Sequence, residues 1–579
     1  MKYLQNKFRF LLSVLAIAVL FSACNNAAPK EAKFIPKDIS AVLAMDPKMM
    51  QDKLEKAGIG MDTLIDQLFK RHAVDTAEKS KYYALRDSAG IDWASKIFLF
   101  FLQKKGGQNP DANVINIMGG LKDAKKFEAF LNILGVLGNK KILKEKAYSY
   151  IIINSGAMIA WNETNLIGTK YSSWIKPYYD SVAMKFVVPE KINTEAAMKA
   201  EVNRYFTQKE SESLASVNAF GNMFKSKSDG YAFSSTNSYL SILSTMPLQL
   251  PKLEEMLKDN YLASTLSFDE GKIVATTTTY TNPLVSSILK KYAGPTVNLS
   301  MIENYPSDNI NMMMLASFNP AIFGGVLKQL EVEGLVNSFM EKTGFSSQEL
   351  YRSLKGDIAV VVSDLGMPSK EIKVKNDSTL NVKRRPVGKM IFTAPVGDSL
   401  SFFKIMNKAV ELGYFVKKGS EFKAGKLMSF LGMYVHADSK NFIIASDSTT
   451  YIQYATHKTK AVIGNDALNL FRGKSTVAYF DIANTIKGFM SDSSSDYKNS
   501  LATAKYTFKD LIASSENFDG SAVNGKLEIR LNNEKQNSLV TLTSLITDIA
   551  VDMRLASKKQ SDEETRIFPS GVPAIIRTN

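Results

Sequence analysis

The chain has 579 residues, of which 45% are hydrophobic and 10% aromatic, so it can bury cores and is not disordered throughout. Its formal net charge of +15 comes from 60 Lys and 12 Arg. Bidentate recognition of phosphates and guanines relies on Arg, and no basic stripe is interleaved with aromatic residues, so we expect no nucleic-acid partner. A general attraction to an anionic membrane surface is the simpler explanation of this charge.

The first predicted element is an N-terminal export signal. Three basic residues among the first nine precede an apolar run over 10–21. This run is too short to span a bilayer and fits the hydrophobic region of a signal peptide. Small residues then precede Cys24, the only cysteine of the chain. We therefore predict a signal peptide over 1–23, followed by a lipidated, flexible tether over 24–33.

The sequence around Cys24 resembles the lipobox of bacterial lipoproteins. The resemblance implies that the Cys24 thiol carries a diacylglyceryl group, that the chain is cut before Cys24, and that the new amine is acylated. Two or three acyl chains anchor a protein stably in a bilayer, since each buried CH₂ contributes about 0.8 kcal/mol. An ordinary secretory signal with an incidental cysteine is the alternative. Residues 25–29 are "NNAAP". An Asp directly after the cysteine would resemble a signal for inner-membrane retention, and an acidic run would resemble a signal for surface export, but neither is present. We expect the outer membrane, with the protein facing the periplasm in preference to the cell surface.

The remainder of the chain repeats one order of predicted elements. Six segments of residues 34–291 match six segments that lie mostly in residues 305–556. The matched pairs are 34–50 with 304–323, 90–102 with 353–365, 114–134 with 388–410, 149–168 with 430–447, 228–243 with 473–490, and 269–289 with 523–546. We predict an α+β fold of two tandem, internally duplicated modules of antiparallel strands backed by helices. The modules are 34–291 and 305–556, with a linker over 292–304 and a disordered tail over 557–579.

The third matched pair predicts a strand followed by a capped helix in each module. Asp123 and Asp398 follow these strands and can accept hydrogen bonds at a helix N-terminus. Phe127 and Phe402 lie one turn further along the amphipathic helices. The features that the halves share are Pro, Gly, capping Asp, Phe and strand aliphatics, which build a fold. They share no His and no pair of carboxylates.

Residues that could carry chemistry are few. The three histidines, His72, His436 and His457, have no metal-ligand spacing, and Cys24 is committed to lipid. "FRGKST" at 471–476 lacks the first glycine of a phosphate-binding loop, since residue 468 is Leu. We therefore expect no metal, no cofactor and no catalytic site, and we predict a protein that is not an enzyme.

One short pattern is more frequent than composition predicts: Asp, then Ser or Thr, then a small or apolar residue or Thr. It resembles the O-glycan acceptor sequence of exported Bacteroidota proteins. The same dipeptides are also favoured at turns and helix starts, which is the alternative explanation. The candidate acceptors are Thr63, Thr76, Ser88, Ser181, Ser378, Ser399 and Ser448.

The whole sequence resembles a known family. The lipobox, the segment "FIPKDISAVLAMDPKMMQDKLEKAGI" at 34–59, the strand–Asp–helix unit and its repetition after residue 304 resemble Bacteroidota lipoproteins catalogued as domain of unknown function 4836. The resemblance covers nearly all of the mature chain. It implies an envelope lipoprotein and supplies neither an activity nor site residues.

These observations favour a non-enzymatic, outer-membrane-anchored envelope lipoprotein of unknown specific activity. Its partners would be the lipid bilayer, through acylated Cys24, and an unknown envelope protein that contacts strand faces and the cleft between the modules. The alternative is a carrier of a lipid or other hydrophobic ligand, held in a cavity lined by some of the 24 Met and 33 Phe residues. A large apolar cavity would distinguish the carrier. A hydrolase is the least favoured alternative.

Overall fold

The computed structural model describes residues 28–60, 62–63, 76–104, 111–175, 177–180, 183–239, 250–366, 387–429, 432–456, 465–489, 498–543 and 545. The predicted signal peptide over 1–23 and the predicted tail over 557–579 lie outside these residues and stay predictions. The chain forms two compact units. Unit 1 takes the ranges 1–49, 80–249 and 257–265, and unit 2 takes 50–79, 250–256 and 266–579.

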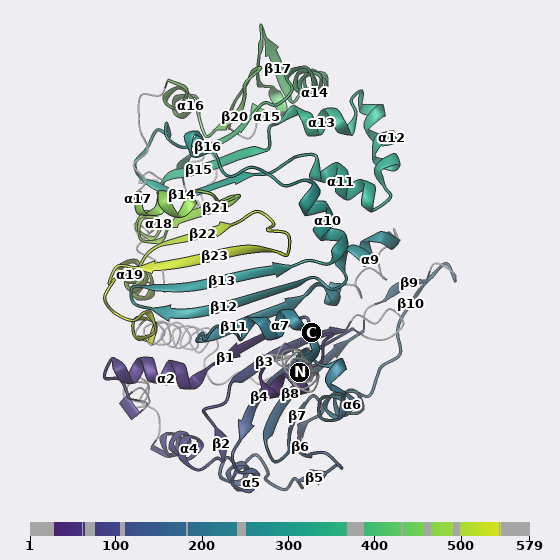
Figure 1. Cartoon of the computed structure of the whole chain (residues 1–579), viewed down its shortest axis with the longest axis vertical. Helices are drawn as coiled ribbons and strands as arrows, with labels where there is room; N and C mark the ends of the chain where they lie inside the picture. Colours follow the sequence, from purple (N-terminus) through teal and green to yellow (C-terminus); the bar gives the residue numbers. More distant parts are fainter. Residues whose placement is uncertain are drawn as a thin grey trace, which may run out of the picture. The chain divides into compact units, whose positions relative to one another are not determined.

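Unit 1 contains a ladder of antiparallel strands (Figure 1). In order of pairing the strands are β5 (Leu143–Lys144), β6 (Ser149–Asn154), β7 (Ala157–Trp161), β8 (Asn165–Trp174), β4 (Asp111–Leu121), β3 (Ile97–Lys104), β1 (Ala41–Met45) and β11 (Gly230–Ser235). The short strand β2 (Ile91–Asp92) pairs with the end of β4. The helices of this unit are η1 (Lys30–Phe34), α5 (Ala124–Ile133), α6 (Thr194–Thr207), η2 (Glu210–Glu212), η3 (Leu214–Ser216), α7 (Asn218–Met223) and η4 (Thr236–Tyr239).

Unit 2 contains a longer antiparallel ladder. Its strands pair in the order β17 (Phe415–Lys418), β18 (Glu421–Ala424), β19 (Tyr434–Ala437), β20 (Asn441–Ala445), β16 (Val387–Pro395), β15 (Asp357–Gly366), β14 (Ile310–Ser317), β21 (Thr476–Asp481), β22 (Phe508–Ser515), β23 (Ala522–Leu531) and β13 (Lys272–Tyr280). Its helices are α10 (Pro283–Lys291), η5 (Leu299–Met301), α11 (Ile322–Gln329), α12 (Glu333–Thr343), α13 (Ser347–Ser353), α14 (Ser399–Glu411), α15 (Lys426–Ser429), α16 (Ser448–Ala455), α17 (Asn465–Phe471), α18 (Ile482–Phe489) and α19 (Lys498–Thr507). Each of four further elements includes residues assigned to unit 1 and residues assigned to unit 2: α2 (Pro47–Lys56), α4 (Thr76–Asp87), α9 (Pro251–Leu257) and β12 (Tyr261–Asp269).

The combination of helices with antiparallel sheet confirms the predicted α+β class. The order of eight strands is also the same in the two units: the series from β5 to β11 in unit 1 corresponds, strand by strand along the chain, to the series from β17 to β21 in unit 2. Internal duplication would produce this correspondence. Duplication itself, and the module boundaries of 34–291 and 305–556, stay predictions.

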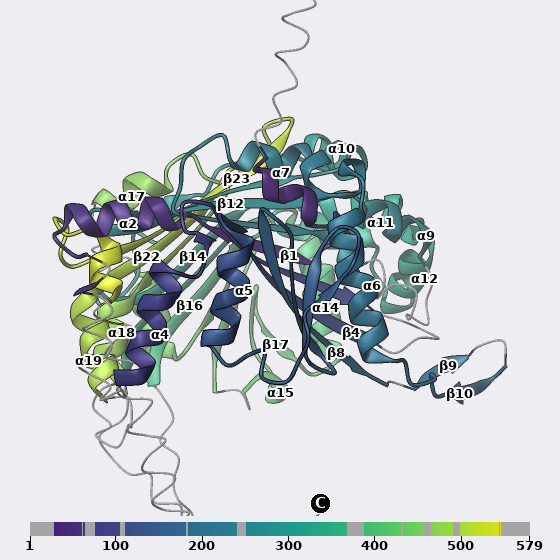
Figure 2. The same ribbon diagram turned by 90° about the horizontal axis from the view of Figure 1, so that it is seen from below.

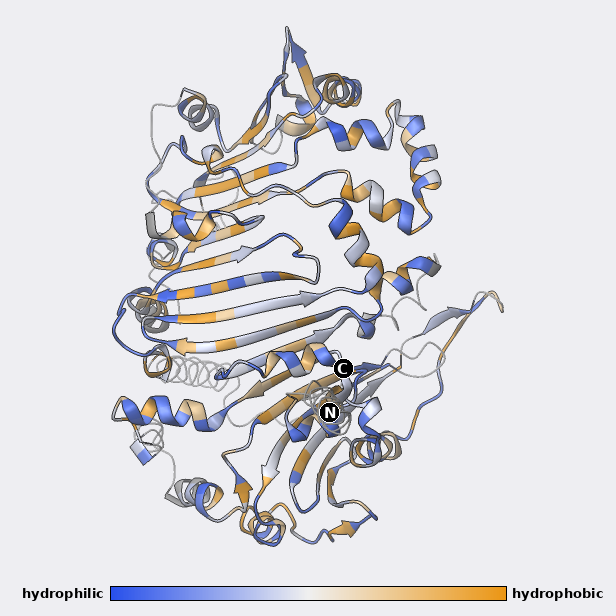
Figure 3. Cartoon of the chain, viewed as in Figure 1, coloured by the Kyte–Doolittle hydropathy of each residue, from blue (hydrophilic) through white to orange (hydrophobic). Residues whose placement is uncertain are grey.

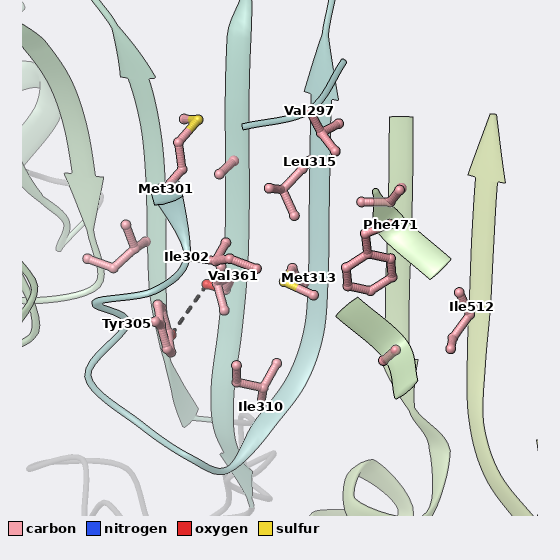
Figure 4. Packing of buried hydrophobic residues seen from close by; sticks show 14 of the residues in the cluster. Val297, Met301, Ile302, Tyr305, Ile310, Met313, Leu315, Val361, Phe471 and Ile512 are labelled. Atoms are coloured by element: carbon pink, nitrogen blue, oxygen red, sulfur yellow. Dashed lines mark hydrogen bonds between the residues drawn. The ribbon is translucent and has the colours of Figure 1, made fainter. Parts of the chain in front are cut away.

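The core of unit 2 lies on one face of its ladder (Figure 4). Met313 from β14 and Val361 from β15 pack there with Phe471 from α17, and all three are buried. Tyr305 is also fully buried, and its hydroxyl lies 3.4 Å from the Val361 carbonyl oxygen, which accepts a hydrogen bond. On the corresponding side of unit 1, the Phe100 ring of β3 packs edge to face against Tyr205 of α6, with ring centroids 5.4 Å apart.

The two predicted helix caps are present in the structure. The Asp123 carboxylate accepts a hydrogen bond from the Lys126 amide at 3.0 Å at the start of α5. The Asp398 carboxylate accepts one from the Ser401 amide at 2.9 Å at the start of α14. One turn later, Phe127 and Phe402 are both buried, as the amphipathic pattern predicts.

Two segments that the sequence suggested were connectors are folded. Residues 30–33 of the predicted tether belong to η1, where Ala32 is fully buried and Gln208 Nε2 donates to the Lys33 carbonyl at 2.8 Å. The predicted linker over 292–304 places Val297, Met301 and Ile302 in the core of unit 2. The physical reason is that apolar side chains of both segments are buried in the fold. Composition and turn residues alone do not predict this burial.

Among the described residues, no helix is long and apolar enough to cross a membrane.

Candidate functional site

Cys24, the predicted attachment point for lipid, precedes the first residues that the structure describes. Cys24 itself is outside the described residues. The structure begins at Ala28, and η1 begins at Lys30. Because an extended chain covers at most about 3.6 Å per residue, six residues let the start of η1 stand no more than roughly 20 Å from Cys24. An acyl group on Cys24 would therefore hold unit 1 close to the membrane surface.

One face of the unit 1 ladder exposes large apolar side chains. Leu43 and Met45 of β1 are each close to half exposed, and Ile115 and Ile117 of β4 are similarly exposed. The register pairs Leu43 with Leu99 of β3, and Leu99 with Ile117. Directly paired residues point to the same face of an antiparallel sheet. These side chains therefore form one continuous apolar surface, which we call open face 1.

The ladder of unit 2 has an open face of the same kind. Met312 and Met314 of β14 are exposed, each by about two fifths. Met314 pairs with Val360 of β15, and Met312 pairs with Val362 of β15 and Phe480 of β21, all three of which are half-buried. We call this surface open face 2. Hydrophobic residues recur along the strands of both ladders in Figure 3.

Each open face is covered by a helix at one end. In unit 1, Phe127 of α5 packs edge to face on Trp161 of β7, with centroids 5.5 Å apart, and both are buried. In unit 2, Phe402 of α14 belongs to a buried cluster with Phe422 of β18 and Ala437 of β19. The residues that follow β4 and β16 thus cover the strands from β6 to β8 and from β18 to β20. The helices leave exposed the apolar residues of β1 and β4 in unit 1 and of β14 in unit 2.

Unit 2 also contains a pocket of about 880 Å³ whose lining residues are mostly charged or amide-bearing. Lys53 Nζ and Asn537 Nδ2 donate to the Phe268 carbonyl, at 2.7 and 2.9 Å. Phe268 is the pocket's one aromatic side chain, and no methionine lines it. This pocket is therefore not the Met- and Phe-lined cavity expected of the carrier. Its lining residues are Lys53, Lys56, Ala57, Phe268, Asp269, Glu270, Lys272, Asn533, Lys535, Gln536 and Asn537.

A titratable cluster surrounds His436 on β19. Lys423 Nζ donates to His436 Nδ1 at 2.8 Å, and since an ammonium group can only donate, Nδ1 must be the acceptor. His436 Nε2 then carries the proton and donates to the Asp438 carboxylate at 3.3 Å. The Lys423 hydrogen bond lowers the pKa of Glu421. The His436 ring also lies 5.0 Å from the Tyr451 ring.

This cluster occupies both nitrogens of the buried imidazole, so it ties β18 to β19 and to the turn that follows. The sequence does not predict this cluster, because Lys423 becomes a neighbour of His436 only through the pairing of β18 with β19. His72 and His457 lie outside the described residues. In the part of the chain that the structure describes, no group of three or more His, Cys, Asp or Glu side chains could hold a metal ion.

The candidate glycosylation sites fall into three groups. Thr63, Ser88 and Ser448 are exposed, and Ser399 is half-buried. Ser448 and Ser399 each follow an N-cap aspartate, Asp447 of α16 and Asp398 of α14, so the alternative role in helix capping is real for those two dipeptides. The side chain of Thr76 and the whole of Ser181 and Ser378 are outside the described residues. Modification at any of these sites stays a prediction.

The sequence predicts that strand faces contact a partner, but it does not identify the residues that form open face 1 and open face 2. Their signal is present in retrospect: strands such as "AVLAM" at 41–45 and "NMMML" at 311–315 are apolar on both sides, where alternation with polar residues is usual for a strand with one wet face.

Comparison with known proteins places the chain in a family. No curated protein and no solved structure is similar to it. Residues 32–374, more than half of the chain, match the family model described as "Domain of unknown function (DUF4836)". The matched segment begins in η1 of unit 1 and extends beyond β15 of unit 2. The chain therefore belongs to the DUF4836 family.

Proposed function

We propose that this protein is an outer-membrane-anchored lipoprotein that faces the periplasm and binds another envelope protein through its open faces. Binding, without catalysis, is the activity. The observation that carries the proposal is the presence of exposed apolar rows on corresponding strands, β1 in unit 1 and β14 in unit 2. Contiguous exposed apolar surface is costly in water and marks interaction sites.

The anchor supports this location. Acylation of Cys24 would supply two or three chains, which is enough for stable membrane attachment. The short connection from Cys24 to η1 would keep the folded protein at the membrane surface, where envelope proteins are concentrated. The excess of basic over acidic residues adds a weak attraction to anionic lipid headgroups.

The shape of the apolar surface favours a protein partner over a small ligand. Sites for small hydrophobic ligands are concave and enclose most of the ligand. Open face 1 and open face 2 are rows on sheets, and the pocket described above is lined mostly by charged and amide-bearing residues. The carrier and the hydrolase therefore lack a specific observation in their favour.

The anchor is tested with Cys24→Ser. We expect the variant to lose membrane attachment and to appear in the soluble periplasmic fraction, because the thioether can no longer form. Ser22→Ala, which retains a small residue before the cysteine, is the matched control and should stay in the membrane fraction. A Cys24→Ser protein that resists extraction as firmly as the parent would contradict the anchor.

The binding surface is tested by site-specific photocrosslinking in whole cells. A photoreactive residue at Ile117 probes open face 1, and one at Met314 probes open face 2. Lys125 on α5, which is exposed but lies on a polar helix surface, is the control position. We expect discrete protein adducts from the two open-face positions and none from Lys125. Adducts of equal yield at all three positions would contradict a specific partner surface.

A further inference from the structure

A small hairpin of unit 1 stands apart from the ladder. Strands β9 (Tyr178–Asp180) and β10 (Lys185–Val187) pair with each other, with Tyr179 opposite Phe186. Within the described residues they form a separate two-stranded sheet. Figures 1 and 2 both show this hairpin extending away from β8, the strand that precedes it.

The hairpin exposes an unusual amount of apolar surface. Met184 is 78% exposed, Phe186 75% and Val188 64%. Tyr179 is 54% exposed, and its ring packs edge to face on Phe186 with centroids 5.3 Å apart. Trp174, at the end of β8, is also exposed. Tyr179, Met184, Phe186 and Val188 belong to the hairpin or adjoin it, and we call these four residues the hairpin tip; Trp174 precedes them at the end of β8.

An isolated two-stranded hairpin is only marginally stable in water. The hairpin tip gains little from its own packing, because its largest side chains remain in solvent. A partner that covers them is therefore expected to stabilise the hairpin as well as to bind it.

The chemistry of the tip matches a membrane interface. Trp and Tyr have apolar bodies and polar ends and are enriched at the level of lipid headgroups. Phe186 and Met184 supply side chains that can enter the acyl region. Lys185, which is exposed and is paired with Asp180 on the opposite face of the hairpin, and the exposed Lys191 can remain among anionic headgroups.

We propose that the hairpin tip inserts into the interface of a lipid bilayer and is a second, reversible membrane contact of unit 1. This inference rests on the proposed function, because the acyl group on Cys24 is what brings unit 1 within roughly 20 Å of the membrane. A protein partner at the hairpin is the competing possibility, and it is an outcome of the test below.

The contact is weak by itself. A few side chains in the interface resemble a single short acyl chain, which binds membranes marginally and reversibly. Loss of the acyl group would therefore still release the protein during washing, as the Cys24→Ser experiment requires. The hairpin would set the orientation of unit 1 on the membrane, and the lipid would provide the attachment.

The test uses the mature chain with Cys24→Ser, so that no acyl group contributes. Its binding to vesicles of phosphatidylcholine and phosphatidylglycerol is measured by sedimentation, in the parent and with Phe186→Ser added. We expect Phe186→Ser to weaken vesicle binding by about tenfold or more, since burial of one Phe accounts for at least that factor. The matched control is Phe339→Ser on α12, because Phe339 is also an exposed phenylalanine, at 66%. It should bind like the parent.

A spectroscopic readout separates insertion from simple adsorption. Quenching of tryptophan fluorescence by lipids brominated along their acyl chains should increase on binding and should disappear in Trp174→Phe. The other two tryptophans are Trp161, which is fully buried in the core, and Trp93, which is half-buried and precedes β3. Absence of vesicle binding by the parent, or equal weakening by Phe186→Ser and Phe339→Ser, would overturn the proposal. A photoreactive residue at Phe186 that forms a protein adduct in cells, with no quenching by brominated lipid, would also overturn the proposal and would indicate a protein partner at the hairpin. None of these outcomes depends on acylation of Cys24, so a failure here is distinct from a failure of the anchor.

Discussion

The two units share a strand order but differ in the connection that follows the fourth strand of that order. In unit 2, β20 leads directly into α16, which begins at Ser448. In unit 1, β8 is followed by the β9–β10 hairpin before α6 begins at Thr194. The shared ladder supports both connections equally well. The difference teaches that the scaffold is common to the units, while a distinct surface is added in a loop, where insertions disturb the core least.

A second difference lies in the hairpins at the end of each ladder. In unit 1, β6 and β7 bury Tyr150, Met158 and Ala160. In unit 2, the corresponding β18 and β19 place Lys423 and His436 in contact. Apolar packing therefore holds β6 to β7 in unit 1, where a hydrogen-bonded polar cluster holds β18 to β19 in unit 2.

The largest expected effect tests whether α5 and α14 are equivalent. Phe127→Ala and Phe402→Ala each remove a buried ring that is 4% exposed, and each should lower the free energy of unfolding of its own unit by about 3–5 kcal/mol. Hydrogen exchange, followed peptide by peptide, would locate the loss in the residues of that unit. The exposed Phe339→Ala is the control and should change stability little. Unequal losses at Phe127 and Phe402 would break the comparison between the two helices.

A smaller effect concerns the caps of the same helices. Asp123→Ala and Asp398→Ala each leave amides of the first helical turn without their acceptor, so local opening of that turn should become about fivefold more frequent. Amide exchange of Lys126 and Ser401 measures this directly. Asp→Asn at either position should preserve most of the protection, because Asn is a comparable N-cap. Protection that falls for only one helix would show that the caps are not equivalent.

The smallest expected effect per residue is the loss of stability at low pH, which should differ between the two units. Hydrogen bonds from Ser401 lower the pKa of Asp398, and backbone amides of Ala522 and Ser521 lower the pKa of Asp519 to about 2. Burial opposes ionisation of Asp447, but hydrogen bonds from Thr450 outweigh it and lower that pKa also. In the described part of unit 1, Asp87 beside Arg86 is the carboxylate with a lowered pKa.

A carboxylate whose pKa is lower in the folded state stabilises that state above its unfolded pKa, near 4. The stabilisation is lost as pH falls through the folded pKa. Unit 2 should therefore lose more exchange protection than unit 1 between about pH 4 and pH 2. Exchange measured across this range, corrected for the intrinsic pH dependence of the amides, tests the difference. Equal loss in both units would mean that these carboxylates do not distinguish them.

Much of the local structure was predictable because its causes are local. The capped helices at Asp123 and Asp398 follow from a hydrogen-bond acceptor and an apolar residue one turn later, and both are present in the structure. The strands of the matched segments follow from apolar runs between turn residues. The folded state of 30–33 and 292–304 was not predictable in this way, because the burial of Ala32 and Ile302 depends on residues far along the chain.

Sequence alone predicts the α+β class, the matching order of elements in two halves, the helix caps and the candidate lipid attachment at Cys24. These depend on side-chain chemistry and short-range periodicity, which a linear sequence displays. Only the tertiary structure decided which apolar residues are exposed. Met312 and Met313 are neighbours of the same type, yet Met313 is fully buried and Met312 is exposed, because strand pairing assigns successive side chains to opposite faces and helices cover one face more completely than the other. The same reason explains why the open faces, the His436 cluster and the hairpin tip became visible only in the fold.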